Sequence, residues 1–351
     1  ADSAGIYRKL DIVSYRIQEG PEQDIVVSSR IRLARNFRQI PFPSQADKNA
    51  QQQVIELAKE GAAASGIENM NFVAMKDLPE LDKEYLVETH SISQDLARSK
   101  RNCGLLIGES PVSVMVNEED HLRIQSILPG LQLQKAYEEC LKYERVPVLQ
   151  KHYAFTYEFG YLTACPTNTG TALRASAMVH VPALVLSGKI NSVLDSCSKL
   201  GIAVRGIYGE NSGSGAHMLQ ISNQLTLGQS EQEILNSIEN IIEQICMLER
   251  KARAMLSESK GIYFIDMIYR ALGILKNART IDSEEAMKLL SEVKMGIDME
   301  ILHGASKSQL VTMMTNVQPA CVQKLQGKIL SPEERDQERA ASIRECIKGI
   351  E

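Results

Sequence analysis

The stretch Asn117-Glu118-Glu119-Asp120-His121-Leu122-Arg123 places three acids in a row inside a strand pattern. Before it, residues 104–109 and 112–116 carry apolar side chains at every second position, on either side of Ser110-Pro111. Alternation that flanks a turn dipeptide predicts a β-hairpin. After the acids the alternation resumes as far as Leu128. The acidic run therefore interrupts a predicted sheet.

In an extended chain, Glu119, His121 and Arg123 would share one face, with the Cα atoms of Glu119 and Arg123 about 13 Å apart. Their long side chains could then meet around one group between them. A carboxylate that handles a nucleophile and an arginine that takes charge from phosphoryl oxygens suit phosphoryl transfer. The alternative is a solvated charged turn, which for an acidic run alone is the commoner outcome.

The composition is that of a globular protein with two domains, or one large domain and an appendage. The 351 residues are 44% hydrophobic and 24% charged, and the net charge is −5. This charge argues against nonspecific binding to nucleic acid or anionic lipid over the whole surface, although it leaves room for a local basic patch. No apolar run approaches the roughly 20 residues of a membrane span, and a signal segment is missing from the start. We therefore expect no membrane association and no direct nucleic-acid partner.

The cysteines indicate a reducing compartment. There are seven, none of them in a Cys-x-x-Cys pair, at positions 103, 140, 165, 197, 246, 321 and 346. An odd, scattered set argues against a zinc cage or a disulfide framework, and it predicts a cytoplasmic protein.

The chain changes character near residue 258. Before it, strand and helix patterns are mixed, and a capping box at Ser230 and Glu233 opens a long helix over about 231–257. After it only helical patterns occur; Asp282 opens one helix, and the Ser331-Pro332 capping box opens the last. We predict an α+β domain over residues 1–257 and an all-helical domain over 258–351.

Arginines, rather than a glycine-rich loop, are the candidate phosphate ligands. Neither G-x-x-x-x-G-K-[ST] nor G-x-G-x-x-G is present. Arginine is always charged and can hold phosphate with two donors. Five arginines lie in or beside strand patterns, at Arg30, Arg32, Arg123, Arg174 and Arg205. One such arginine is most often a surface residue with an apolar stem, but five suggest convergence on one site.

Cys165 lies in the hydroxyl-rich loop Cys165-Pro-Thr-Asn-Thr-Gly-Thr171. One interpretation is a small buried hydrophobic residue, and the other is a thiolate beside a cationic substrate, because positive neighbours lower a thiol pKa. The sequence leaves both open.

Several motifs follow one another in a specific order: Ser28-Ser29-Arg30-Ile31-Arg32, the acidic run, the Cys165 loop, Arg174-Ala-Ser and Val204-Arg205-Gly206. In that order and spacing, over about residues 22–255, they resemble the ATP:guanidino phosphotransferases, or phosphagen kinases. The resemblance implies a mixed antiparallel sheet flanked by helices, ATP and Mg²⁺ as cofactors, Glu119 as catalytic carboxylate and Cys165 beside the guanidinium. It implies ATP contacts from Ser28, Ser29, Arg30, Ile31, Arg32, His90, Arg123, Arg174, Ala175, Ser176, Ala177, Met178, Arg205, Gly206, Ile207, Tyr208, Gly209 and Glu210, and no protein ligands to a metal. Glu210 is also a candidate second catalytic carboxylate, with an ordinary surface acid as the alternative.

The sequence departs from the creatine and arginine kinases in three features, and in all three it resembles the bacterial branch of the family that phosphorylates arginines in proteins. Only 27 residues precede Ser28, Tyr208 replaces a second arginine, and a helical domain follows. That branch also has an Arg-Asp-x-x-Arg-Ala motif that receives phosphoarginine, which corresponds to Arg335, Asp336, Arg339 and Ala340. Without a domain that clamps a free amino acid, an arginine held in a protein chain becomes the expected substrate.

The same resemblance implies partners and a role in the stress response. These are protein substrates with exposed arginines, a heat-shock transcriptional repressor, a zinc-finger activator protein, a Clp-type unfoldase or protease, and a second copy of the chain in a dimer. The modification would mark proteins for degradation and inactivate the repressor. The alternatives are a kinase for free arginine or another small guanidino compound, and a non-catalytic adaptor that binds phosphoarginine.

Overall fold

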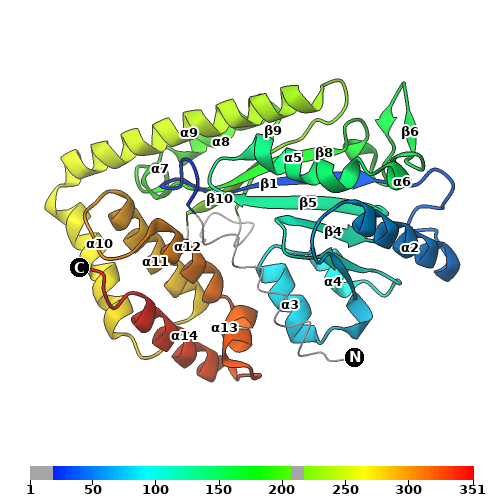
Figure 1. Cartoon of the computed structure of the whole chain (residues 1–351). Coiled ribbons are helices and arrows are strands. Elements are labelled where there is room, and N and C mark those ends of the chain that lie inside the picture. The colour runs from blue at the N-terminus through cyan, green and yellow to red at the C-terminus, as the bar shows by residue number, and fades with distance from the viewer. Residues whose placement is uncertain (1–18, 207–216) are drawn as a thin grey trace.

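The computed structural model describes residues 19–206 and 217–351, and its centre is an eight-stranded sheet (Figure 1). The strand order is β2-β3-β4-β5-β1-β8-β10-β9, and each of the pairings is antiparallel. The strands are β1 Val26–Arg35, β2 Asn71–Ala74, β3 Gly104–Ile107, β4 Val112–Val116, β5 Leu122–Pro129, β8 Leu173–His180, β9 Ile202–Gly206 and β10 Met218–Asn223. The predicted hairpin over 104–116 is confirmed as β3 and β4.

Helices cover both faces of the sheet. The larger core lies under the long amphipathic helices on one face, α2 Lys48–Ala64, α5 Leu133–Glu144 and α9 Glu231–Lys260, with α6 Pro147–Gln150, α7 Pro182–Leu186 and α8 Ile190–Lys199 beside them. A smaller cluster, which includes Leu86, Leu105 and Met115, packs under α3 Glu80–Glu88 and α4 Gln94–Arg98. Neighbours Leu105 and Leu106 join different clusters because side chains alternate along a strand. A two-stranded hairpin, β6 Phe155–Thr156 with β7 Gly160–Tyr161, stands apart from the sheet.

All regular elements after Gly261 are helices: α10 Ile262–Asn277, α11 Ser283–Asp298, α12 Lys307–Asn316, α13 Pro319–Gln326 and α14 Pro332–Cys346. Helix α9 runs three residues beyond the predicted end at 257, and Gly261 then turns the chain with φ of +48°. The predicted boundary at 257/258 therefore falls inside a helix.

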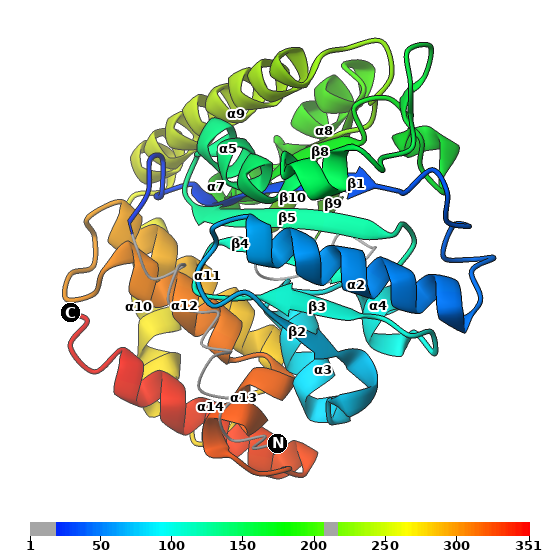
Figure 2. The same ribbon diagram turned by 45° about the vertical axis from the view of Figure 1, so that its right-hand side comes forward.

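The C-terminal helices pack against the rest of the chain through polar contacts. His180 of β8 shares a hydrogen bond of 2.7 Å with Ser291 of α11, and the buried Lys294 ammonium donates to the Asp24 carbonyl at 3.2 Å. Helix α13 lies beside α3, as Figure 2 shows. The helical region is thus fixed at one end of the sheet.

Local capping rules placed the helix starts correctly. Ser230 and Glu233 make the predicted capping box of α9, as Ser331 and Glu334 do for α14. Asp282 caps α11 by accepting from the Glu285 amide at 2.8 Å. Gly188, with φ of +68°, separates α7 from α8. Within the described ranges, no helix is long and apolar enough to cross a bilayer.

Candidate active site

One face of the sheet carries the predicted arginines. Strand β1 presents Ser28, Arg30 and Arg32 on this face, because every second side chain points the same way. The register of β8 places Met178, Ser176 and Arg174 directly opposite them. On the other side, β5 brings Arg123 opposite Ala34. Three arginines from three strands, Arg32, Arg123 and Arg174, thus meet at one end of the face.

These arginines line a cavity with about 590 Å³ of space, open solvent included, together with Glu119, Asn168, Asn223, Gln224 and other residues. Burial lowers the pKa of Arg32 well below its usual value, and the neighbouring Arg30, Arg123 and Arg174 lower it further, although Glu118 opposes them. Burial, Arg205 and Arg123 also lower the pKa of Arg174. Among the described residues, the buried Nε atoms of Arg32 and Arg174 have no hydrogen-bond partner. A crowded set of cations with spare donors suits a ligand with several negative charges.

The acidic run forms a tight turn between β4 and β5, so the expected extended conformation is wrong. Asn117 has φ of +59°, its amide donates to the His121 carbonyl at 2.9 Å, and its side chain donates to the carbonyls of Gln51 and Asn102. Asparagine tolerates this left-handed conformation better than most residues. The turn reverses the chain and brings Glu119 close to Arg123.

His121 does not share a face with Glu119, contrary to the prediction. Its ring is buried, accepts from the Phe37 amide at Nδ1 (3.0 Å), and lies 2.9 Å from the Pro41 carbonyl through Nε2. Burial lowers the pKa of His121. This histidine is therefore a neutral structural residue that fixes the loop after β1.

The three acids of the turn have three different environments. The buried Glu118 carboxylate pairs with Arg123 at 2.7 Å. Asp120, also buried, accepts from the Asn36 side chain at 2.6 Å and from the Ala164 amide at 2.8 Å, which anchors the start of the Cys165 loop. Only Glu119 reaches the cavity, half-exposed, with one oxygen 3.1 Å from Arg123.

The Glu119 carboxylate is tuned toward proton acceptance. Burial raises its pKa, and Asp120, Glu118 and Asp95 raise it further, while Arg123 opposes them. A carboxylate with a raised pKa is a better general base than an ordinary surface acid. Glu119 and Arg123 together therefore offer a base and a charge acceptor at one point.

The Cys165 loop borders the same cavity. Cys165 is partly exposed, and its Sγ lies 3.0 Å from the Thr167 hydroxyl. Asn168, three residues on, lines the cavity itself. The interpretation of Cys165 as a fully buried hydrophobic residue is therefore wrong.

A second cavity, with about 680 Å³ of space that includes open solvent, adjoins the other end of the arginine face. Its lining includes Ser28, Arg30, Ser176, Met178 and His90. His90 has φ of +55° and follows α3, which brings it over the sheet. The location of His90 near a nucleotide base stays a prediction.

Comparisons with known proteins agree with this geometry. The family model for the C-terminal catalytic domain of ATP:guanido phosphotransferases matches residues 51–252, and the model for the protein-arginine kinase McsB C-terminal domain matches residues 262–351. A protein-arginine kinase from Halothermothrix orenii is 46% identical over 93% of this chain and 94% of its own length. One from Bacillus subtilis is 44% identical over 95% of this chain and 93% of its own.

The chain belongs to the protein-arginine kinase branch of the ATP:guanido phosphotransferase family. The fold agrees with that of a crystal structure of lombricine kinase, with a TM-score of 0.58 and 22% identity over 67% of this chain and 69% of that one. The predicted fold class is confirmed.

In the two predicted runs of ATP contacts, 28–32 and 174–178, four of the ten side chains do not face the cavity. Ser29, Ile31, Ala175 and Ala177 are buried on the opposite face, where the Ser29 hydroxyl donates to the Gly130 carbonyl at 2.8 Å. The prediction named unbroken runs, whereas strand alternation allows only every second residue to face the cavity. These four side chains are corrected to core positions.

Two of the remaining predicted positions, Arg205 and Gly206, lie on β9. Arg205 is exposed on this strand, opposite Gln220 of β10, and Gly206 ends the strand. Ile207, Tyr208, Gly209 and Glu210 lie outside the described residues.

In the C-terminal motif, the two arginines expected to bind phosphoarginine, Arg335 and Arg339, have different environments. Arg339 is only 2% exposed; it donates to the carbonyls of Val317 (2.6 Å) and Ile281 (2.8 Å) and to Asp336 (2.5 Å). Ala340 is buried, whereas Arg335 and Asp336 are partly exposed. Arg339 therefore fixes the fold and positions Asp336, because its Nε and Nη1 groups are already engaged.

Sequence reasoning missed three residues of the guanido phosphotransferase site: Glu118, Asp120 and Asn36. Asn36 also accepts from the His121 amide at 2.8 Å, so it links the acidic turn to the end of β1. The sequence signal for Glu118 and Asp120 was their position on either side of Glu119. Their separate roles could not be predicted, because the partners of Asp120 come from distant parts of the chain.

Proposed function

We propose that this protein transfers the γ-phosphoryl group of ATP to arginine side chains of proteins. The observation that carries the proposal is the cavity in which Glu119 meets Arg32, Arg123 and Arg174. Three arginines supply positive charge for a polyphosphate, and one carboxylate stands at their edge for the acceptor. The family membership and the protein-arginine kinase relatives support the same reaction.

Glu119 would act on the acceptor arginine. A guanidinium has a pKa above 12 and is a poor nucleophile while protonated. The Glu119 carboxylate would align the guanidinium and accept one N–H proton as that nitrogen bonds to the γ-phosphorus. The bond from the γ-phosphorus to the β,γ-bridging oxygen breaks, and ADP leaves with the electron pair. The raised pKa of Glu119 suits this proton transfer.

The arginines would stabilise the charge that spreads over the phosphoryl oxygens. Arg123 is held from behind by the buried Glu118, so its guanidinium is positioned before a substrate arrives. Arg32 and Arg174 have free buried Nε donors within the described part of the chain. Preorganised donors of this kind are commonly the largest contribution to a rate enhancement.

Cys165 and Glu210 have secondary roles in the proposal. Cys165 would orient the second guanidinium nitrogen from a loop that Asp120 anchors at Ala164. Glu210 would be a second carboxylate for the acceptor.

Mg²⁺ fits the cavity as a companion of the nucleotide. Its lining has oxygen donors at Glu119, Asn168, Asn223 and Gln224, and Mg²⁺ is usually held by few protein oxygens together with substrate phosphates. When bound, the ion neutralises charge on the phosphates.

An aromatic hairpin favours a polypeptide acceptor over free arginine. Phe155, Tyr157 and Phe159 are exposed on and between β6 and β7. Tyr161 of the same hairpin forms an antiparallel bridge with Gly170, so the hairpin is joined to the Cys165 loop. Exposed apolar patches are typical of interaction surfaces, and a free amino acid would not need one.

The proposal extends to domains, regulation and partners. It divides the chain into a catalytic domain over residues 1–257 and a helical domain over 258–351 that binds phosphoarginine through Arg335 and Asp336 and contributes to a dimer. The partners would be a heat-shock repressor, a zinc-finger activator and a Clp-type unfoldase or protease in the cytoplasm, under stress. The family likeness supports these statements. The seven free thiols support the cytoplasmic location.

The test is a competition for the acceptor. The protein is incubated with γ-labelled ATP, an unfolded arginine-containing protein and an excess of free arginine. We expect label on the polypeptide and little change as free arginine increases. Transfer to free arginine alone would favour the small-molecule kinase, and absence of any ATP turnover would favour the adaptor.

A further inference from the structure

The active face of the sheet changes from cationic to apolar along β1. Arg32 lies among Arg123 and Arg174, whereas Ser28, four residues earlier, has Pro129 and Met178 as its strand neighbours. At ~3.3 Å per residue these two positions are about 13 Å apart. A nucleoside triphosphate has the same polarity, with charged phosphates at one end and a flat, largely apolar base at the other.

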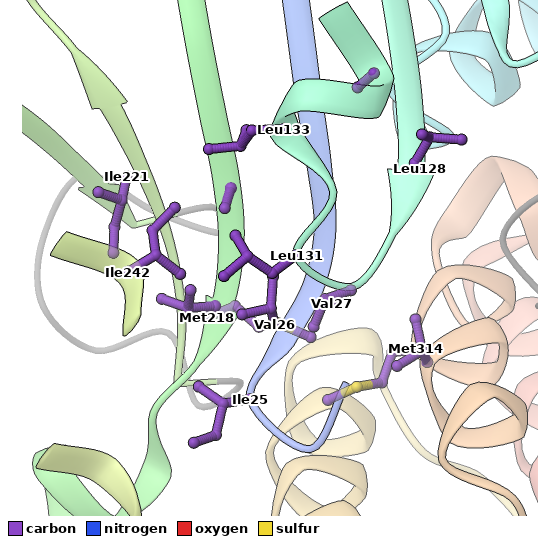
Figure 3. Close-up of a cluster of buried hydrophobic side chains, with 14 of the residues drawn as sticks. Ile25, Val26, Val27, Leu128, Leu131, Leu133, Met218, Ile221, Ile242 and Met314 are labelled. Carbon is purple, nitrogen blue, oxygen red and sulfur yellow. The ribbon is translucent and has the colours of Figure 1, made fainter. Parts of the chain in front are cut away.

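Helix α12 closes the apolar end. Val311, Met314 and Thr315 line the second cavity opposite Val27, Met178 and Met218. Val311 and Met314 share one side of the helix, since they are three residues apart, and they are 8% and 2% exposed. Figure 3 shows Met314 reaching from its helix toward Val27 at the start of β1. This wall comes from the C-terminal helical region, not from the sheet domain.

Several contacts hold α12 in this place. Ser306 caps its first turn, Gln309 donates to the Cys346 carbonyl at 2.8 Å, and Arg339 donates to the carbonyl of Val317, the residue that caps the helix end. The contacts of Gln309 and Val317 join α12 to α14. The wall is therefore a fixed surface and not a loose loop.

The opposite edge of the cavity is tied to the same helical region. Glu88 accepts from the amides of Ala320 and Cys321 at the start of α13, at 2.9 and 2.8 Å, and Asp82 pairs with Lys324 at 2.5 Å. His90, which lines the cavity, follows Glu88 by two residues. The helical region thus forms one wall directly and positions a second wall through α3.

We propose that α12 completes the nucleoside site, with Val311, Met314 and Thr315 in contact with the nucleoside of bound ATP. The inference rests on the proposed function, since it presumes a nucleotide whose phosphates occupy the arginine cavity. Met314 and Val311 form the apolar contact for the base, and the Thr315 hydroxyl is the polar group that the helix brings to the cavity. The helical region is then part of the nucleotide site as well as a regulatory unit.

Calorimetric titration of the full-length chain tests this assignment. The ligands are Mg-ADP and inorganic tripolyphosphate, and the variants are Met314→Ala and Met313→Ala. Met313 is a matched control, since it lies on the same helix, is equally buried (4% against 2% exposed) and does not line the cavity. Met314→Ala should raise the dissociation constant for ADP about tenfold, as expected for lost apolar contact in a pocket, and leave tripolyphosphate binding unchanged. Met313→Ala should leave both affinities unchanged.

Thr315→Val, which keeps the side-chain volume, provides a second variant if Met314→Ala does not fold, and it should weaken ADP binding without affecting tripolyphosphate. Equal ADP affinity in the wild type and the folded cavity variants overturns the inference while leaving the proposed function intact. An equal loss in Met313→Ala and Met314→Ala also overturns it, because the effect is then one of stability. A wild type that binds neither ligand overturns the proposed function as well.

Discussion

Glu119 and Glu118 are adjacent in sequence, and replacing each with glutamine should give opposite results. Glu119 is 44% exposed and its ion pair with Arg123 spans 3.1 Å, so its loss should change the free energy of unfolding by at most about 1 kcal/mol. Losing a general base should lower kcat by about 10²–10⁴-fold, or about 3–5.5 kcal/mol in the barrier. Glu118 is 2% exposed and paired with Arg123, so Glu118→Gln should cost about 3–5 kcal/mol of stability.

The assay combines kcat for phosphoryl transfer, the dissociation constant for Mg-ADP and the melting temperature for both variants. Glu119→Gln should bind ADP normally and melt like the wild type. The dependence of kcat on pH is a further readout. Because the base must be ionised, wild-type activity should rise with pH through the pKa of Glu119, which is raised above its ordinary 4.5. This rise should be absent in Glu119→Gln. Near-normal kcat in a folded Glu119→Gln protein would refute its assignment as the base.

Other substitutions test the rest of the site. Arg123→Lys keeps the charge but loses the planar guanidinium, so kcat should fall severely while the protein stays folded. Normal turnover in this variant would show that two-donor binding by Arg123 is not needed. Arg205→Ala should raise the KM for ATP far more than substitution of Tyr208 does, and normal ATP kinetics in Arg205→Ala would exclude that arginine from the site. Asp336→Ala should weaken phosphoarginine binding, as measured by calorimetry, with ATP binding intact; equal affinity in wild type and variant would return the motif to a purely structural role.

Local patterns were enough for much of the fold. Strand alternation predicted the β3–β4 hairpin, and capping boxes placed the starts of α9 and α14 within one residue. These features depend on residues within four positions of one another, so they can be predicted from the local sequence. The same holds for the arginines of β1, whose spacing by two puts them on one face.

The remaining features depend on contacts between distant residues. The turn after β4 is set by Asn117, whose side chain is held by the carbonyls of Gln51 and Asn102, so an extended chain was the natural but incorrect expectation. Arg339 is buried because carbonyls 22 and 58 residues away accept its hydrogen bonds. A helix pattern alone suggests an exposed arginine, since arginine is rarely buried unless paired. The approach of α12 to the sheet has no local sequence signal.

We propose that the arginine cavity and Glu119 together catalyse the phosphorylation of arginine in proteins. Mass spectrometry of an unfolded protein substrate, kept near neutral pH after incubation with the kinase and Mg-ATP, tests it most directly. We expect acid-labile phosphate on arginine residues with the wild type and almost none with Glu119→Gln. Phosphate on serine, threonine or tyrosine, or none on arginine with a folded wild type that binds ATP, would contradict it.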